Sequence, residues 1–128
     1  MTARSRFGGN APWESIVGYS RAIRSGDAIH VSGTTALDEH GRLVGERDAD
    51  ALTRRILGSI ADVLDRAGAG VEHVVRTRIY VTDVSRWQEI GRAHGEFFRD
   101  VRPTTAMVEV SALIDPGMLV EIEVEARP

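Results

Sequence analysis

The stretch Pro103-Thr104-Thr105-Ala106-Met107-Val108-Glu109-Val110 is the most informative part of this chain. Polar and apolar residues alternate along it, and a period of two residues predicts a β-strand over 104–111. Val108 and Val110 are expected to face the helices, whereas Thr105, Met107 and Glu109 are expected to face away from them. Residues 120–125 alternate more cleanly still and predict another strand.

Residues 48–67 predict an amphipathic helix, because apolar residues recur at three- and four-residue steps with charged residues between them. The apolar positions are Leu52, Ile56, Ile60, Val63, Leu64 and Ala67. Gly68 and Gly70 are expected to end this helix. The period changes to two residues over 71–82, which predicts a long strand. One face of that strand would carry Val75, Thr77, Ile79 and Val81, and the other Val74, Arg76, Arg78 and Tyr80.

The segment Ser85-Arg86-Trp87-Gln88 fits a capping box, in which the Ser hydroxyl bonds an exposed amide of the first helical turn and the Gln side chain reaches back. It predicts a second helix that runs to about Phe98 and buries Trp87, Ile90, Phe97 and Phe98. Nearer the N-terminus, a turn at Gly26 between two β-compatible segments, 19–24 and 28–32, predicts a hairpin. Residues 38–41 are a second turn signal, and a short strand is expected near Leu43.

These elements predict an α+β fold, a mixed six-stranded sheet with two helices packed on one face. A length of 128 residues with 42% hydrophobic residues suits one packed core, so residues 1–128 are expected to form a single domain. Residues 1–12 are expected to be an N-terminal arm that is poorly ordered or peripheral. The sheet face away from the helices is expected to be covered by association, since it would carry Arg76, Arg78, Met107, Glu109, Glu121, Glu123 and Glu125.

Composition argues against several classes of function. A net charge of −3 and a pI near 5.8 do not suit a protein that binds nucleic acid through phosphate contacts. The chain has no cysteine, which excludes disulfides, thiolate metal sites and cysteine nucleophiles. Its four histidines lack paired ligand spacing, so no metal or other cofactor is expected. An apolar N-terminal run and a segment of membrane-spanning length are both lacking, so a cytoplasmic protein without a membrane partner is expected.

Several segments, in this order and spacing, resemble the RidA/YjgF imine deaminase family. They are 103–110, Gly18-Tyr19-Ser20, Val31-Ser32-Gly33, 76–83 and Glu121-Ile122-Glu123-Val124. The resemblance extends from about Trp13 to Ala126. It implies a RidA/YjgF fold, which is chorismate mutase-like, and a homotrimer whose three sheets form a barrel-like centre with ligand clefts between subunits.

The resemblance also implies roles for individual residues. Tyr19 and Glu121 match a Tyr and a Glu that position a hydrolytic water on a substrate imine, and a carboxylate can orient and deprotonate water. Ser32 and Gly33 match a strand end whose backbone approaches the ligand, and Trp87 matches an aromatic wall over it. Each has a plainer alternative: an interface Tyr, a surface carboxylate, an ordinary turn and a core Trp.

This chain departs from the family pattern at its signature strand, which usually reads Pro-x-Arg-x-Cys-Val-x-Val. Thr105 stands where the family has the Arg that grips a substrate carboxylate, and Met107 stands where it has the Cys. A bidentate contact of that kind contributes on the order of 1.5 to 3 kcal/mol. Its loss would weaken binding of an amino-acid-derived imine by roughly tenfold to a hundredfold or more.

Two other arginines could replace the missing cation. Arg21 shares strand parity with Tyr19, and Arg78 is expected on the face averted from the helices; for each, the alternative is a solvated or ion-pairing Arg. His94 is a further candidate because it titrates near neutrality.

Two functions follow from these residues. The first is a homotrimer that binds a small carbonyl, enamine or imine metabolite between subunits and, as a deaminase, hydrolyses it with release of ammonia. The alternative is a non-catalytic trimer that binds a small molecule and regulates. Thr105 favours the alternative, and Tyr19 with Glu121 favours the hydrolase.

Overall fold

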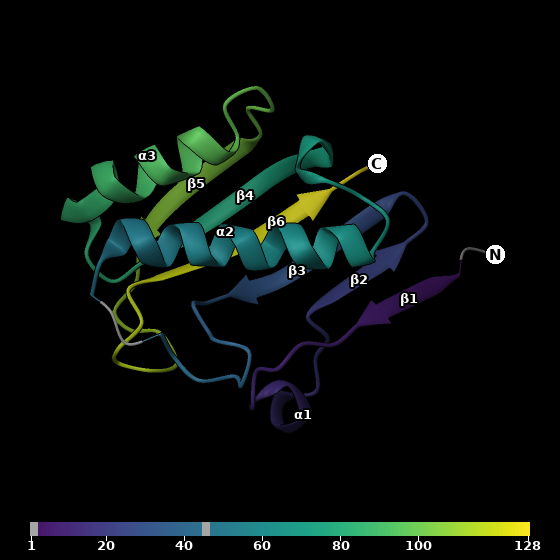
Figure 1. The fold of residues 1–128 in the computed structure, drawn as a ribbon, viewed down its shortest axis with the longest axis horizontal. Coiled ribbons are helices and arrows are strands. Elements are labelled where there is room, and N and C mark those ends of the chain that lie inside the picture. The colour runs from purple at the N-terminus through teal and green to yellow at the C-terminus, as the bar shows by residue number, and fades with distance from the viewer. Residues whose placement is uncertain (1–2, 45–46) are drawn as a thin grey trace.

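A six-stranded mixed sheet with two helices on one of its faces forms the body of the computed structural model, which describes residues 3–44 and 47–128 (Figure 1). The strands are β1 (Arg4–Phe7), β2 (Ala22–Ser25), β3 (Ala28–Thr34), β4 (Val74–Val81), β5 (Thr104–Glu109) and β6 (Val120–Ala126). The helices are α1 (Glu14–Val17), α2 (Ala49–Arg66) and α3 (Trp87–Phe97), with 3₁₀ turns η1 (Val71–His73) and η2 (Val84–Arg86). The predicted α+β class is therefore confirmed.

The last strand in sequence lies in the middle of the sheet. The strand order is β1-β2-β3-β6-β4-β5, and among the described strands only β4 and β5 pair in parallel (Figure 1). In β6, Val120, Ile122 and Val124 are buried, while Glu121, Glu123 and Glu125 alternate with them on the other face. The predicted alternation is confirmed here, because both faces of a central strand have distinct surroundings.

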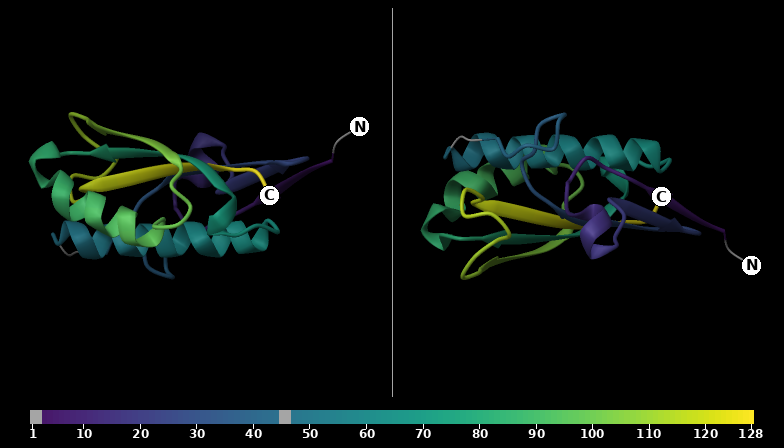
Figure 2. Two further views of the ribbon diagram at one scale, coloured as in Figure 1. Left: turned by 90° about the horizontal axis from the view of Figure 1, so that it is seen from above. Right: turned by 90° about the horizontal axis from the view of Figure 1, so that it is seen from below.

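Helix α2 forms where the spacing of apolar residues predicts it. The carboxylate of Asp48 caps its first turn by accepting from the Ala51 amide, and Gly68, at φ 84°, follows its end. Its apolar stripe, which includes Ile56, Ile60 and Leu64, packs on the sheet. Both α2 and α3 lie on the same side, as predicted (Figure 2). The opposite side of the sheet, without a helix layer over β4 and β6 among the described residues, is called the open face below.

The sixth strand comes from an unexpected segment. Residues 4–7, within the expected N-terminal arm, form β1 and pair antiparallel with β2 at the sheet edge. The short strand expected near Leu43 is wrong, because Leu43 makes only an isolated bridge to Leu37. Gly41, whose φ is 76°, lies in the turn between the two bridged residues.

Strand β5 presents the opposite faces from those predicted. Thr105 pairs in register with buried Thr77, and Met107 with buried Ile79, so both lie on the helix side. Val108 is on the open face and 47% exposed. The prediction failed because β5 is an edge strand with little contrast in burial, and its pairing with β4 sets its faces. The open face therefore keeps the arginines and glutamates of β4 and β6 but not Met107 or Glu109.

A bulge alters the start of β4. Val74 pairs with Ala126 and Arg76 with Glu125, so two steps in β4 match one in β6. The extra residue turns Val74 into the core and leaves Val75 43% exposed, against the predicted alternation. Beyond the bulge, Thr77, Ile79 and Val81 face the helices as predicted.

The predicted capping box of α3 is wrong. Ser85 lies inside η2, and its amide and hydroxyl both donate to the Asp83 carboxylate, at 3.0 and 2.6 Å. Helix α3 thus begins after a short 3₁₀ turn that Asp83 caps. Ile90 and Phe98 are buried as predicted and Phe97 is half-buried, but Trp87 is 55% exposed and is not a core residue.

Within the described residues, no helix is both long and apolar enough to cross a membrane. Residues 3–44 and 47–128 likewise contain no group of three or more His, Asp or Glu side chains that could hold a metal ion.

Candidate functional site

A cleft of about 450 Å³ opens where β3 and β6 run into their neighbouring loops. It contains four of the residues that the sequence suggested, namely Tyr19, Ser32, Gly33 and Glu121. Its remaining lining residues are Trp13, Val17, Thr35, Ala112, Leu113 and Ile114. The predicted residues lie on three separate segments of the chain, and the central position of β6 brings them together. We call this the Glu121 cleft.

A bulge in β3 shapes the floor of this cleft. Val31 pairs with Val124 and Thr34 with Ile122, so β3 has one residue more than β6 over this stretch. Gly33 lies in the bulge, directly beneath the Glu121 side chain. A methyl group on Gly33 would lie 2.7 Å from Glu121 Oε1, so the absence of a side chain at 33 lets the carboxylate occupy its place.

The carboxyl group of Glu121 is electrostatically suited to exchange protons. Burial, followed by the neighbouring Glu123 carboxylate, raises the pKa of Glu121, while Arg21 opposes the rise. A carboxylate with a raised pKa is a better base than an exposed one. Burial also raises the pKa of Tyr19, so its phenol stays protonated and can donate a hydrogen bond.

Arg21 lies beside this cleft and binds the backbone of its floor at Gly33. Its guanidinium donates to the Gly33 carbonyl oxygen and lies 5.8 Å from the centre of the Tyr19 ring. Burial lowers the pKa of Arg21. Arg21 lines a separate groove, with Thr34 and Thr35, on the other side of β3. The structure thus brings Arg21 beside the predicted site residues but directs its guanidinium at the backbone.

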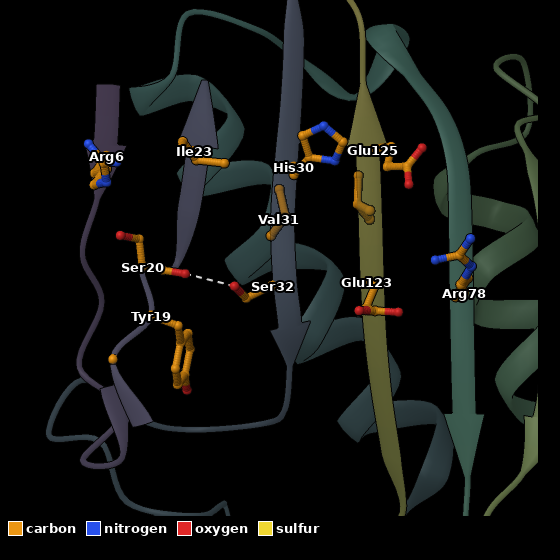
Figure 3. Close-up of a pocket in the computed structure, with 12 residues that line it drawn as sticks. Arg6, Tyr19, Ser20, Ile23, His30, Val31, Ser32, Arg78, Glu123 and Glu125 are labelled. Carbon is orange, nitrogen blue, oxygen red and sulfur yellow. Dashed lines mark hydrogen bonds between the residues drawn. The ribbon is translucent and has the colours of Figure 1, made fainter. Parts of the chain in front are cut away.

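Ser32 fastens the segment that carries Tyr19. Its hydroxyl donates to the Ser20 carbonyl at 2.7 Å (Figure 3), and its amide donates to the Arg21 carbonyl at 2.9 Å. Residues 20 and 21 precede β2, so these two bonds hold an irregular segment against a regular strand. Ser32 therefore sets the position of Tyr19 as well as lining the cleft.

Arg78 lies in a different hollow, of about 500 Å³, on the open face (Figure 3). Arg78 pairs in register with Glu123, and the Tyr80 hydroxyl donates to the same Glu123 carboxylate. Tyr19 and Ser32 line both this hollow and the Glu121 cleft, so the two concave regions adjoin. Arg78 lies opposite Glu123, which is two residues along β6 from Glu121.

Trp87, Thr105 and Met107 do not line the Glu121 cleft of the same chain. Thr105 and Met107 are on β5, which is separated from β6 by β4. Thr105 is exposed, yet its hydroxyl makes a hydrogen bond of 2.6 Å with the Thr77 hydroxyl. The Thr77 hydroxyl also makes a hydrogen bond of 2.9 Å with His94 Nε2. On one chain, the structure therefore brings Tyr19, Ser32, Gly33 and Glu121 together and leaves Trp87, Thr105 and Met107 outside their cleft.

The cleft has an apolar rim that the sequence patterns did not predict. Short helix α1 and the loop after β5 bring Trp13, Val17, Leu113 and Ile114 around the polar floor. Val17 and Ile114 are 67% and 61% exposed. Apolar residues on either side of Gly18 were the feature of the sequence that could have indicated this rim. Gly18, at φ 85°, ends α1, and a helix of four residues is too short to show a period.

The chain is similar to known proteins in its sequence and in its fold. Residues 8–127 match the family model described as Endoribonuclease L-PSP. A crystal structure of a YjgF/YER057c/UK114 family member from Mycobacterium tuberculosis is 48% identical, with a TM-score of 0.88 over 98% of this chain and 100% of that chain. An uncharacterized protein of Streptomyces coelicolor is 38% identical over 94% of this chain and 90% of its own length. The 3-aminoacrylate deaminase of Acinetobacter baylyi is 33% identical over 81% of this chain and 82% of its own length.

Proposed function

Because this chain belongs to the endoribonuclease L-PSP family, which includes the YjgF and Rid proteins, we propose that it is a deaminase of small enamines or imines. The ligand would occupy the Glu121 cleft, and the products would be a carbonyl compound and ammonia. One relative is itself called a 3-aminoacrylate deaminase, which supports this class of reaction.

The half-buried Glu121 carboxylate, whose pKa is raised by burial, is the observation that carries the proposal. Glu121 holds a water molecule and accepts its proton as the oxygen attacks the imine carbon, so that a carbinolamine forms. Proton transfer to nitrogen then lets the C–N bond break, and ammonia leaves as the C=O bond forms. Tyr19, which keeps its hydroxyl hydrogen, donates to the substrate or to the attacking water. An enamine enters the same sequence after protonation at carbon.

A second copy of the chain would complete the site. Thr105 and Met107 lie on β5, two strands from β6, Trp87 begins α3, and none of the three lines the Glu121 cleft of its own chain. We propose a homotrimer in which these residues of one subunit face Tyr19, Gly33 and Glu121 of the next. The exposed apolar rim around the cleft favours such an arrangement, because association would remove it from water.

Thr105 favours a second function from a different class. Without a guanidinium at this position, the trimer would keep a cleft but hold an amino-acid-derived imine weakly. The rival is therefore a non-catalytic protein that binds a small carbonyl or imine compound and signals its level.

Substitution of Glu121 separates the two functions. Imines generated in situ by an amine oxidase or an amino-acid oxidase serve as substrates, and ammonia release gives the turnover. Glu121→Gln is expected to preserve assembly and ligand affinity while lowering kcat by roughly a hundredfold or more. Glu125→Gln is the matched control, since Glu125 lies on the same strand and face but outside the Glu121 cleft.

Unchanged turnover in Glu121→Gln would remove this residue from the mechanism. Binding of every tested imine and enamine without conversion by the wild type would replace the deaminase with the non-catalytic protein.

A further inference from the structure

Three side chains from three elements form one line of hydrogen bonds beneath β5. His94 of α3 contacts the Thr77 hydroxyl of β4 through Nε2 at 2.9 Å, and Thr77 contacts the Thr105 hydroxyl of β5 at 2.6 Å. His94 is 9% exposed and Thr77 is fully buried, whereas Thr105 is exposed. The line therefore runs from the interior to the surface.

The tautomer of His94 sets the direction of this line, because each hydroxyl has one hydrogen to donate. With a hydrogen on His94 Nε2, the Thr77 oxygen accepts from His94 and the Thr77 hydroxyl donates to Thr105. The Thr105 oxygen already accepts, and no hydrogen bond among the described residues uses the Thr105 hydrogen. That hydrogen is left for a partner outside the chain.

The surroundings keep this line neutral. Burial lowers the pKa of His94, so its ring carries no net charge at pH 7. The other two members are hydroxyl groups, which do not ionise in this range. Consecutive hydrogen bonds polarise one another, and the donor at the end of such a line is strengthened without acquiring a charge.

We propose that Thr105, positioned through Thr77 by His94, donates to the ligand and selects compounds with a neutral carbonyl or amide oxygen at that end in place of a carboxylate. The inference rests on the proposed function, because Thr105 reaches a ligand only where a second copy completes the cleft. A neutral donor satisfies a carbonyl oxygen, whereas a carboxylate that leaves water needs a compensating charge.

Two ligands of the same shape test this selection. The probes are 2-oxobutanoate and 2-oxobutanamide, which differ in a carboxylate against an amide, and calorimetry gives the affinity of the trimer for each. The wild type is expected to bind the amide at least about tenfold more tightly. Thr105→Val should weaken amide binding roughly fivefold and leave acid binding nearly unchanged, so the ratio of affinities falls. Thr105→Ser, which keeps the hydroxyl, should keep the ratio.

The positioning role of His94 has its own variants. His94→Phe keeps a ring beside Phe98 but removes the nitrogen donor, and it should lower the same ratio. Thr77→Val should act likewise, and Thr77→Ser should restore the wild-type ratio. Thr104→Val is the matched control, because the Thr104 hydroxyl donates to the Val75 carbonyl and is not part of this line. The ratio is informative because a general loss of folded protein would lower both affinities together.

Failure of this inference is distinguishable from failure of the deaminase. Preference of the wild type for the acid, an unchanged ratio in Thr105→Val, or binding of neither probe would overturn the selection. Turnover lost in Glu121→Gln would still support the deaminase in each of those cases. A ratio that falls in Thr105→Val but not in His94→Phe or Thr77→Val would refute the positioning role.

Discussion

Glu121 is the residue at which the proposed chemistry is most directly testable by pH. Its carboxylate acts as a base only when ionised, so turnover should fall as pH drops through the pKa of Glu121. Because burial raises this pKa, the acid limb of kcat/KM should lie above the ordinary value of 4.5. The neighbours of Glu121 then predict shifts of opposite sign. Glu123→Gln should move the limb to lower pH, and Arg21→Gln should move it to higher pH.

Ammonia release measured across pH 4 to 8 gives the position of that limb. Glu125→Gln, outside the Glu121 cleft, is expected to leave it in place. Shifts of the same sign in Glu123→Gln and Arg21→Gln would contradict the assignment of the limb to Glu121.

Single residues also show how much of the site could be predicted. Tyr19, Ser32, Gly33 and Glu121 lie together as the family resemblance implied, because β3 and β6 are well-patterned neighbouring strands. Thr105 and Met107 were placed on the wrong face, since alternation fixes which residues share a face but not which face is covered. The line from His94 to Thr105 could not be foreseen, because it depends on the register of β4 with β5.

Elements with strong periodicity were predicted well and irregular ones were not. Helix α2 was predicted to within a residue or two of its bounds, because its apolar stripe spans five turns. Strand β1 has no such pattern, since its burial varies little along Arg4–Phe7. The bulges in β3 and β4 each add one residue, and a single inserted residue leaves no composition signal.

The start of α3 yields a prediction that separates two caps. Asp83→Ala removes the acceptor of both Ser85 bonds and should lower the free energy of unfolding by about 1 kcal/mol. Gln88→Ala should change it by much less, because the capping box does not form. Urea unfolding of the two variants measures the difference. A larger loss of unfolding free energy for Gln88→Ala than for Asp83→Ala would show that the capping box does form.

The whole molecule bears on the proposed assembly. Sedimentation at micromolar concentration is expected to give a mass three times the 14.0 kDa of the chain. Val108 is an exposed valine on the open face, so Val108→Asp should shift the protein toward monomers by placing a charge in the contact. Arg92→Asp, on the exposed side of α3, should not. A wild-type monomer would leave no shared cleft.

The central place of β6 also governs how the protein emerges during synthesis. Until residues 120–126 leave the ribosome, the nascent chain holds β1, β2 and β3 on one side and β4 with β5 on the other, with no strand to join them. Translation at about 5 to 20 residues per second is slow beside helix formation, so α2 has time to form long before its sheet can close. The unpaired edges of β3 and β4 are available to a chaperone, or to a neighbouring nascent chain, for that interval. Rare codons between the codons of β5 and those of β6 would lengthen it, and the yield of native protein should depend on the speed with which β6 is made.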